Sequence, residues 1–335
     1  MASQPHTTSQ RAARGFTLLE LMIAMTIGVV LIAGAFGIVV SSTATREKTE
    51  ASTELLGSTR LIAGVLGDDI RHAGMFGRLR GALSIEGRTG GTNELPPVAG
   101  DCDANFYNDL EQYIFATNNA NPWNATCVGA TWVAGTDILA VKYTDIEDLP
   151  FAAATALPED SVYLFSNPSG GRLFWEGTIP PTTIGYGAAF APEADRLIQP
   201  LRVHIYYLSE PTADVPTRSL RRIGLSGTAG LLYEEEVIAT GVENFQLQLG
   251  IEICDAAVNP CQGIVTQYVT ADTLNWNDPS LVDRIRAVQV LTVSGSDNVD
   301  RPSALTRTYQ FAGENITATT DLRVWQGTFQ VRNNL

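Results

Sequence analysis

The chain has 335 residues, of which 44% are hydrophobic, and its 36 acidic and 22 basic residues give a formal net charge of −14. This length and apolar content suffice for a sizeable core in one or two domains. The negative charge disfavours nonspecific binding to nucleic acid or to anionic lipid.

The first predicted element is an apolar helix that runs from Phe16 to Val40 with Glu20 as its only charge. At about 1.5 Å per residue, a helix of this length crosses a bilayer core of roughly 30 Å. Arg11 and Arg14 precede it, so the N-terminus is expected in the cytoplasm and everything after Val40 outside it. A secretory signal would instead have a shorter apolar core with a small-residue cleavage site after it.

Glu20 needs an explanation, because a carboxylate in a bilayer helix costs about 2.5–3.5 kcal/mol. One explanation is functional: the carboxylate pairs with a positive charge in a low-dielectric environment, where opposite charges attract strongly. The alternative is that Glu20 merely sits at the membrane interface, near the positive end of the helix dipole.

The helix is expected to continue well past the membrane, because no proline lies between Pro5 and Pro96. Apolar residues recur at helical spacing: Leu55, Ile62, Leu66, Ile70 and Ala73, with Leu61 and Val65 widening the stripe. The helix should end near Gly74–Gly77. Residues 41–77 are therefore predicted as an amphipathic half, which needs a folded domain to cover its stripe.

The remainder, residues 78–335, is predicted to be a β-rich domain. Residues 78–137 are rich in Gly, Asn, Pro and Asp and predict loops with little regular structure. Strand-like runs then follow: Asp137–Tyr143, Ser161–Phe165, Arg172–Trp175, Leu201–Leu208, Ser219–Ile223, Glu236–Ala239, Asn244–Ile253, Ile285–Val293, Arg307–Phe311 and Leu322–Val331. Within one of them Phe245, Leu247, Leu249, Ile251 and Ile253 alternate and should share a face. The pattern predicts an α+β protein whose long N-terminal helix, membrane-spanning in its first half, packs on a C-terminal antiparallel β domain.

The four cysteines, Cys102, Cys127, Cys254 and Cys261, all lie beyond the apolar helix, on the side where disulfides form. Four cysteines allow three pairings, and the two local loop closures, Cys102–Cys127 and Cys254–Cys261, are favoured. The alternative is four buried free thiols. No metal is predicted, since there is no CxxC and the three histidines are scattered.

No catalytic or cofactor-binding motif is recognisable, so neither enzymatic activity nor a cofactor is expected. Asp101, Asp103 and Asn105 resemble the start of a calcium loop. However, Phe106 stands where such a loop needs glycine and Gln112 where it needs glutamate. A solvated acidic loop is therefore favoured over a calcium site.

Two small basic clusters and one aromatic run complete the candidate sites. The clusters are Arg71, Arg78 and Arg80, and Arg218, Arg221 and Arg222. Against the negative overall charge they predict surface ion pairs, and direct nucleic-acid binding is not expected. The aromatic run, Phe165, Phe174 and Trp175, is expected in the core rather than as a stacking platform for sugars or bases.

The segment Arg14-Gly15-Phe16-Thr17-Leu18-Leu19-Glu20, followed by the apolar run, resembles the processing and assembly signal of type IV prepilins. The resemblance implies that a prepilin peptidase cuts between Gly15 and Phe16, removes residues 1–15 as a leader and leaves Phe16 to be N-methylated. It also implies that Glu20 pairs with the N-terminal amine of a neighbouring subunit and sets the axial register of a filament. Residues 16–40 would be the transmembrane and assembly half of the helix.

Further segments resemble the PilW family of minor pilins: Asp68-Asp69-Ile70-Arg71-His72-Ala73-Gly74-Met75-Phe76-Gly77, Asp137-Ile138-Leu139-Ala140-Val141, Tyr206-Tyr207, Gly241-Val242-Glu243-Asn244-Phe245-Gln246, Ile285-Arg286-Ala287-Val288-Gln289-Val290 and Val331-Arg332-Asn333. This resemblance implies a structural subunit that joins other minor pilins and the major pilin in a tip complex. The complex would prime pilus assembly, present a large tip adhesin and support twitching motility, adhesion and DNA uptake. The subunit would wait in the inner membrane, its domain in the periplasm, before entering the cell-surface pilus.

Three alternatives belong to other classes. The first is a J-type minor pseudopilin of type II secretion, which shares these signals but is usually much shorter. The second is a binding module whose β domain is itself an adhesin or a DNA receptor at the pilus tip. The third is a signal-anchored periplasmic enzyme, for which the sequence offers no catalytic residues.

Overall fold

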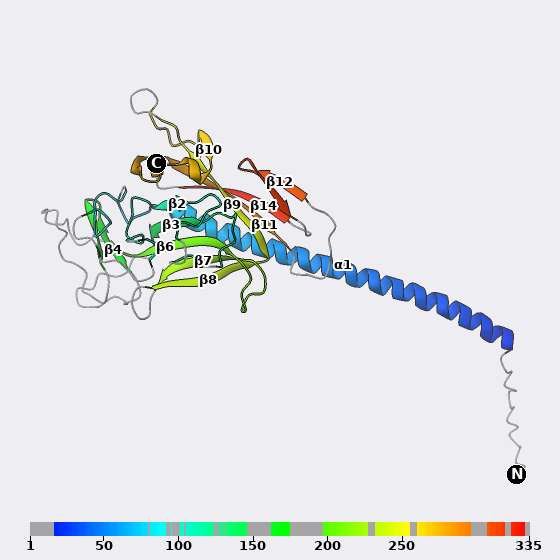
Figure 1. Ribbon diagram of the computed structural model, residues 1–335. Helices are drawn as coiled ribbons and strands as arrows, with labels where there is room; N and C mark the ends of the chain where they lie inside the picture. The colour runs from blue at the N-terminus through cyan, green and yellow to red at the C-terminus, as the bar shows by residue number, and fades with distance from the viewer. Residues whose placement is uncertain are drawn as a thin grey trace, which may run out of the picture. The chain divides into compact units, whose positions relative to one another are not determined.

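The long N-terminal helix is the dominant element in the computed structural model of the chain (Figure 1). The structure describes residues 17–79, 81–91, 95, 101–103, 105–123, 127–129, 131–145, 162–174, 197–226, 232–254, 260–295, 307–318 and 323–331. The chain forms two compact units, Met1–Thr53 and Glu54–Leu335. The predicted α+β fold class is confirmed: one long helix is followed by antiparallel sheets.

Helix α1 (Leu18–His72, 55 residues) begins in the first unit and ends in the second. In the second unit, Leu55, Ile62, Leu66 and Ile70 are buried, as their spacing predicts. The prediction for Leu61 is wrong, because its side chain is 51% exposed. It lies one turn from the exposed glycines 57 and 64, on the face that the sheets leave uncovered.

The first sheet takes its strands from residues 85 to 240. Among the described residues it contains eight strands: β1 (Ile85–Glu86), β2 (Ile114–Ala116), β3 (Leu139–Thr144), β4 (Tyr163–Asn167), β5 (Gly170–Phe174), β6 (Leu197–Ser209), β7 (Ser219–Ser226) and β8 (Leu232–Thr240). The order is β1-β5-β4-β6-β3-β2, and β7 pairs with both β6 and β8. All pairs are antiparallel except β1 with β5.

Strand β6 organises this sheet, because its 13 residues are long enough to pair with three partners. Its first residues pair with β4, Leu201–Tyr206 pair with β3, and His204–Ser209 pair with β7. Every residue of β3 and β4 is buried. Such continuous burial is expected for central strands that are covered on both faces.

The second sheet has the order β10-β9-β11-β14. Its strands are β9 (Val242–Ile251), β10 (Gln267–Val269), β11 (Ile285–Ser294) and β14 (Arg323–Gln330), with the short helices η2 (Ala271–Thr273) and α2 (Pro279–Val282) between them. A separate hairpin, β12 (Arg307–Phe311) with β13 (Glu314–Ala318), turns through Ala312 and Gly313 at φ values of 58° and 83°. Positive φ at both positions is typical of a two-residue hairpin turn.

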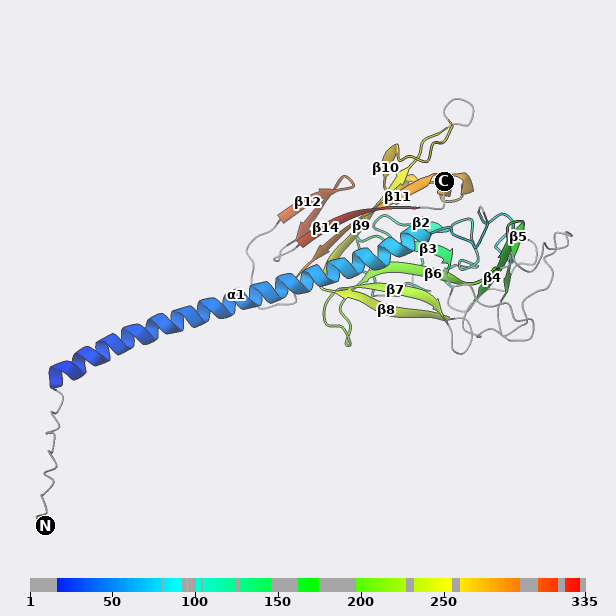
Figure 2. The same ribbon diagram turned by 180° about the vertical axis from the view of Figure 1, so that it is seen from behind.

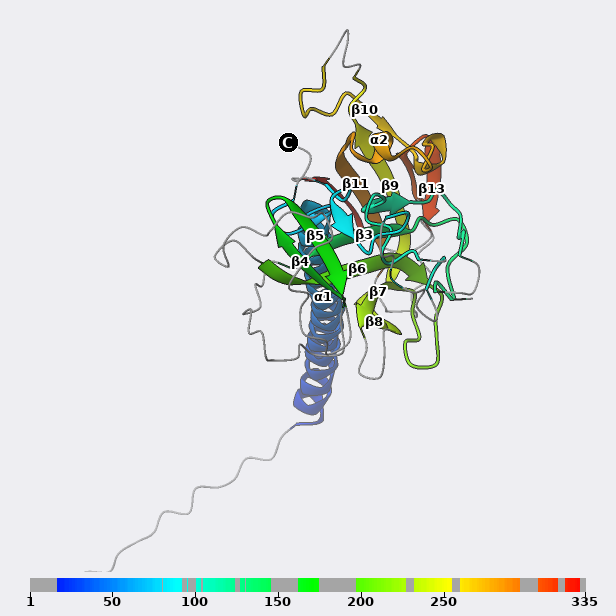
Figure 3. The same ribbon diagram turned by 90° about the vertical axis from the view of Figure 1, so that its left-hand side faces the viewer.

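The two sheets cover one face of the last part of α1 and leave the face with Leu61 exposed. In Figures 1 and 2 this part of the helix runs between β14 and the strands β6–β8. In Figure 3 the strands β9–β11 lie above β6–β8. Side chains from the helix and from both sheets share one apolar core, in which Ile62, Leu66 and Ile70 meet Val203 of β6 and Phe245 of β9.

The expected strands are present, and each overlaps a strand of the structure. Three residues at the ends of expected strands lie outside the described residues: Ser161, Trp175 and Leu322. The alternation prediction is wrong at Ile253, which is 55% exposed because β9 ends at Ile251. The short strands β1, β2, β10 and β13 carry too little periodic sequence to be predicted.

Candidate functional site

The exposed apolar part of α1 is the first candidate site. Leu18–Thr43 has a mean hydropathy of 2.6, and none of its most apolar window is buried. It is the one stretch among the described helices that is long and apolar enough to span a membrane, judged by length and composition. A surface of this kind requires a bilayer or other protein surfaces to cover it.

Glu20 lies in the first turn of α1 and caps the helix with Thr17. The backbone N–H and the hydroxyl of Thr17 each donate to Glu20 Oε2 at 3.0 Å, and Glu20 N–H donates to Thr17 Oγ1 at 3.3 Å. This reciprocal pattern is a capping box, which satisfies donors that a helix start leaves unpaired. Gly15 and Phe16, the predicted cleavage and methylation positions, lie outside the described residues.

All four cysteines form disulfide bonds, Cys102–Cys127 and Cys254–Cys261, which are the local pairings favoured from the sequence. Glu252 lies beside the second bridge, but its carboxylate accepts hydrogen bonds from Gly263 N–H at 3.1 Å and from Arg286 Nε at 2.8 Å. Disulfide sulfurs are not thiolates, and this carboxylate already has partners. The group therefore closes a loop and is not suited to hold a metal.

A second site joins α1 to the first sheet through Asp69, whose side chain is almost completely buried. Tyr143 Oη donates to Asp69 Oδ1 at 2.7 Å, His204 Nδ1 lies 2.5 Å from Oδ2, and Tyr206 Oη also donates to Oδ2. Arg222 Nη1 adds an ion pair at 3.8 Å. Strands β3, β6 and β7 thus all contribute to one carboxylate on the helix.

The electrostatics of this cluster keep Asp69 ionised. Burial by itself raises the pKa of Asp69, but the hydrogen bond and charge of His204, with the hydroxyls of Tyr206 and Tyr143, outweigh it, so the pKa is lowered. Burial and the neighbouring Asp69 charge raise the pKa of Tyr206 well above its ordinary value. The tyrosines therefore remain protonated donors at neutral pH.

Gly74 and Gly77 follow α1 and belong to the first segment quoted for the PilW resemblance. Gly74 and Gly77 have φ values of 76° and 59°, in the left-handed region that favours glycine. A Cβ on Gly77 would lie 2.1 Å from Ser166 Oγ, and Gly77 N–H donates to Thr144 Oγ1 at 2.9 Å. Gly74 N–H donates to the Lys142 carbonyl at 2.9 Å. The chain leaves the helix by docking closely onto β3 and β4.

Asp137 connects the two sheets in a similar way. Its carboxylate accepts hydrogen bonds from Leu247 N–H at 2.6 Å and from Asn119 N–H at 2.8 Å, while its own N–H donates to the Phe245 carbonyl. Burial raises the pKa of Asp137 to about 7, although the two backbone N–H groups oppose the shift. Two of the segments quoted for the family resemblance therefore meet at Asp137, through the bond from its backbone N–H to Phe245.

The remaining sequence candidates have structural roles. Asp101 accepts hydrogen bonds from the N–H groups of Cys102 and Tyr107 and from Tyr233 Oη, so the calcium-loop resemblance does not form an open ligand set. Phe165 and Phe174 are buried, as predicted, and Trp175 lies outside the described residues.

The predicted ion pairs are present at four of the described arginines. Arg218 pairs with Glu210 and Glu243, and Arg221 with Glu235. The other pairs are Arg222 with Glu236 and Asp69, and Arg71 with Asp68. Arg80 lies outside the described residues. These partners occupy the guanidinium groups that a nucleic-acid interface would need.

Sequence reasoning missed the Asp69 cluster, although it named four of its members separately: Asp69, Tyr143, Tyr206 and Arg222. The available signal was an aspartate inside an apolar helical stripe, beside Ile70. His204 and Tyr206 also share one face of a predicted strand, because they are two residues apart. Buried polar residues on facing elements are expected to pair, since an unpaired buried charge is costly.

The apolar helix, its capped start and the β-rich domain on its second half define a protein of the type IV pilin class. A model of the prokaryotic N-terminal methylation motif matches residues 10–36, and the family of type IV pilus-assembly protein W, PilW, matches residues 205–333. These matches confirm the resemblance to the PilW family and support a type IV pilus-related pilin. Neither the curated proteins nor the solved structures contain a significant match.

Proposed function

We propose that the protein is a minor pilin that helps to prime assembly of a type IV pilus as part of a tip complex. Its partners would be other minor pilins, the major pilin, the prepilin peptidase and a large tip adhesin. It would be held in the inner membrane by residues 16–40, with an N-terminal cytoplasmic leader, and would then pass into the surface pilus. It acts by assembly and not by catalysis.

The proposal rests on one observation: both family matches fall on a single chain, and this chain contains one continuous helix. The methylation motif covers the start of the exposed apolar segment, and the PilW match covers β6 to β14 of the domain. The first match supports processing between Gly15 and Phe16, with N-methylation of Phe16. The second supports a role in pilus assembly rather than in type II secretion.

Glu20 is the proposed assembly contact. Both hydrogen bonds from Thr17 fall on Oε2, within the turn that carries the new N-terminus after cleavage. A capping interaction stabilises the start of the helix modestly. A charge pair with the amine of a neighbouring subunit, enclosed by apolar helices, can exceed that because screening there is weak. Glu20 is therefore expected to exchange its local cap for an intersubunit partner during assembly.

The test is the amount of sheared surface pili from a clean deletion strain, the complemented parent and a Glu20→Ala variant. Loss of pili on deletion, and restoration by the wild-type gene, is expected. Glu20→Ala should be cleaved normally yet restore few pili, because the leader site is intact and the amine partner is gone. Leu31→Ala, in the same apolar segment, is the matched control and should restore piliation.

Two results would contradict the proposal. Normal piliation in the deletion strain together with a defect in protein secretion would assign the subunit to type II secretion. Full piliation with Glu20→Ala would remove Glu20 from the assembly mechanism. Processing is tested separately: substitution of Gly15 by a bulky residue should retain residues 1–15, which mass spectrometry of the N-terminus detects.

A further inference from the structure

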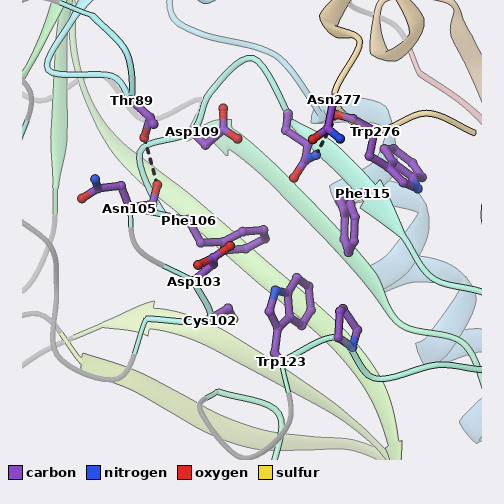
Figure 4. Close-up of a pocket in the computed structure, with 12 residues that line it drawn as sticks. Thr89, Cys102, Asp103, Asn105, Phe106, Asp109, Phe115, Trp123, Trp276 and Asn277 are labelled. Carbon is purple, nitrogen blue, oxygen red and sulfur yellow. Dashed lines mark hydrogen bonds between the residues drawn. The ribbon is translucent and has the colours of Figure 1, made fainter.

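A pocket of about 470 Å³ lies over the loop that the Cys102–Cys127 disulfide closes (Figure 4). Most of its lining comes from that loop, which supplies Asp103, Phe106, Asp109, Phe115 and Trp123. The opposite wall is formed by Trp276 and Asn277, which follow η2. Its volume is within the range of small-molecule sites.

The apolar wall is a continuous row of aromatic rings. Phe106 and Trp123 have ring centroids 5.0 Å apart at 66°, Phe115 and Trp123 are 5.3 Å apart, and Phe115 and Trp276 are 4.9 Å apart. Phe115 and Trp276 are only partly buried, so part of this row faces the pocket. Their spacing is that of paired aromatic side chains.

Trp276 is held in place from two sides. Its indole Nε1–H donates to the Ala271 carbonyl at 3.0 Å, and Gln112 Nε2 donates to the Trp276 carbonyl at 3.3 Å. The loop on the other side is fixed by the disulfide and by Thr89, whose hydroxyl donates to the Asn105 carbonyl at 3.0 Å. A pocket whose walls are already fixed loses little conformational entropy when a ligand binds.

The polar lining contains carboxylates, amides and a hydroxyl, and none of the described lining residues is basic. Asp103 and Asp109 provide negative acceptors, while Gln112 and Asn277 carry amide groups that can donate and accept. This composition excludes an anionic ligand such as a phosphate or a sugar acid, because both carboxylates would repel it.

A cation is also a poor match. Lys142 is fully buried behind the pocket wall, with Nζ 3.8 Å from the Phe106 ring centroid and donating to the Asp109 carbonyl at 2.8 Å. Phe106 therefore already has a cation partner, and the positive charge of Lys142 opposes a second cation beside it. A bound ammonium group would also offer no acceptor to the side-chain amide of Asn277.

We propose that this pocket binds a neutral pyranose unit of a glycan. The ring hydroxyls of such a sugar both donate and accept, so they match carboxylates and amides together. Its C–H groups carry partial positive charge and stack on the negative face of an aromatic ring. The proposal adds a binding activity to the assembly function and does not depend on it.

The experiment measures binding of methyl glycosides of glucose, galactose, mannose and N-acetylglucosamine to the full-length protein. The protein is kept in a polyoxyethylene detergent, which has neither a sugar nor an ammonium head group. Saturation-transfer NMR should show binding of at least one glycoside, with the strongest transfer at ring C–H protons. Asn277→Ala and Trp276→Ala should each weaken that binding by tenfold or more.

Matched controls lie outside the pocket. Tyr268→Ala removes a partly exposed aromatic side chain on β10, and Asp68→Asn removes an exposed charge on α1; both should bind within twofold of the wild type. If Trp276→Ala fails to fold, the exposed Asn277 decides the outcome. Binding of none of the four glycosides, binding that survives Asn277→Ala, or binding of tetramethylammonium without any sugar would each overturn the proposal.

Discussion

Replacing Asp69 by alanine should detach the second half of α1 from the first sheet. The substitution leaves three donors, Tyr143 Oη, Tyr206 Oη and the His204 ring, without their acceptor inside the protein. Among the described residues, it also leaves Arg222 with Glu236 as its ion-pair partner. These groups cannot turn to solvent, because Tyr206 is completely buried and His204 is largely so.

The expected loss in the free energy of unfolding is about 4 kcal/mol. Hydrogen bonds to a charged group contribute roughly 1.5–3 kcal/mol each, but bonds to one carboxylate do not add independently. Removing one partner of a buried charge pair costs about 3–5 kcal/mol, because the remaining charge stays desolvated. A loss of this size is a large part of the stability of an ordinary domain.

The assay is urea unfolding of the full-length protein in detergent, followed by tryptophan fluorescence. All five tryptophans follow residue 53, so their signal reports on the unit that contains the sheets. The matched control is Asp68→Ala, whose exposed carboxylate makes one ion pair with Arg71 at 3.1 Å. An exposed pair is worth well under about 1 kcal/mol, so the control should unfold close to the wild type.

A double-mutant cycle separates the contact from other effects of the substitution. Tyr206→Phe removes only the hydroxyl, and its cost should largely disappear in the Asp69→Ala background, because the hydroxyl then has no acceptor. Equal unfolding midpoints for Asp69→Ala and Asp68→Ala would refute the reasoning. So would full additivity of Asp69→Ala and Tyr206→Phe.

Three further predictions concern other contacts of the domain. The folded pKa of Asp137, about 7 against an ordinary 3.8, means that the folded state binds the extra proton. Stability should therefore fall by about 2 kcal/mol from pH 5 to pH 7, and Asp137→Asn should flatten that slope in urea titrations. Gly77→Ala should lower the free energy of unfolding by about 2–4 kcal/mol, because of the left-handed backbone and the contact with Ser166 of β4. Gly64→Ala, which has open space around it, should instead stabilise the helix by about 0.5–1 kcal/mol. Equal melting temperatures for the two variants would contradict this prediction. Joint substitution of Cys102→Ser and Cys127→Ser opens a loop of sequence separation 25 and should lower the free energy of unfolding by about 3 kcal/mol. An unchanged denaturant midpoint would argue against the bridge.

The helix and the fold class could be predicted because they depend on local patterns. An apolar run with a single acid and a stripe at helical spacing define α1 to within a few residues. The alternating run that became β9 likewise indicates its own strand. By contrast, the partners of each strand depend on contacts far apart in the chain, such as β4 pairing with β6 across residues 175–196. No local pattern encodes such pairings.

The pocket could not be predicted for a similar reason. The loop that contains Phe106 and Trp123 gives only turn-forming signals, and Trp276 lies more than a hundred residues later. Their proximity depends on β2 lying beside β3 and on the second sheet covering the first. The sequence favoured the correct cysteine pairs, yet it gave no sign that one of the resulting loops would line a pocket.

Three buried acids of this domain join distant segments of the chain, and two of them link the family resemblance to the fold. Asp69 bonds to Tyr206 across 137 residues, Asp101 to Tyr233 across 132, and Asp137 to Leu247 across 110. Each carboxylate therefore joins segments that the chain brings together only after folding. A buried charge is tolerated only when several donors surround it. Any alternative packing that separates the charge from these donors is therefore destabilised. Asp69 and Asp137 belong to segments quoted for the resemblance, and Tyr206 and Leu247 lie within the PilW match. The quoted segments thus include positions that fix how the helix and the two sheets meet.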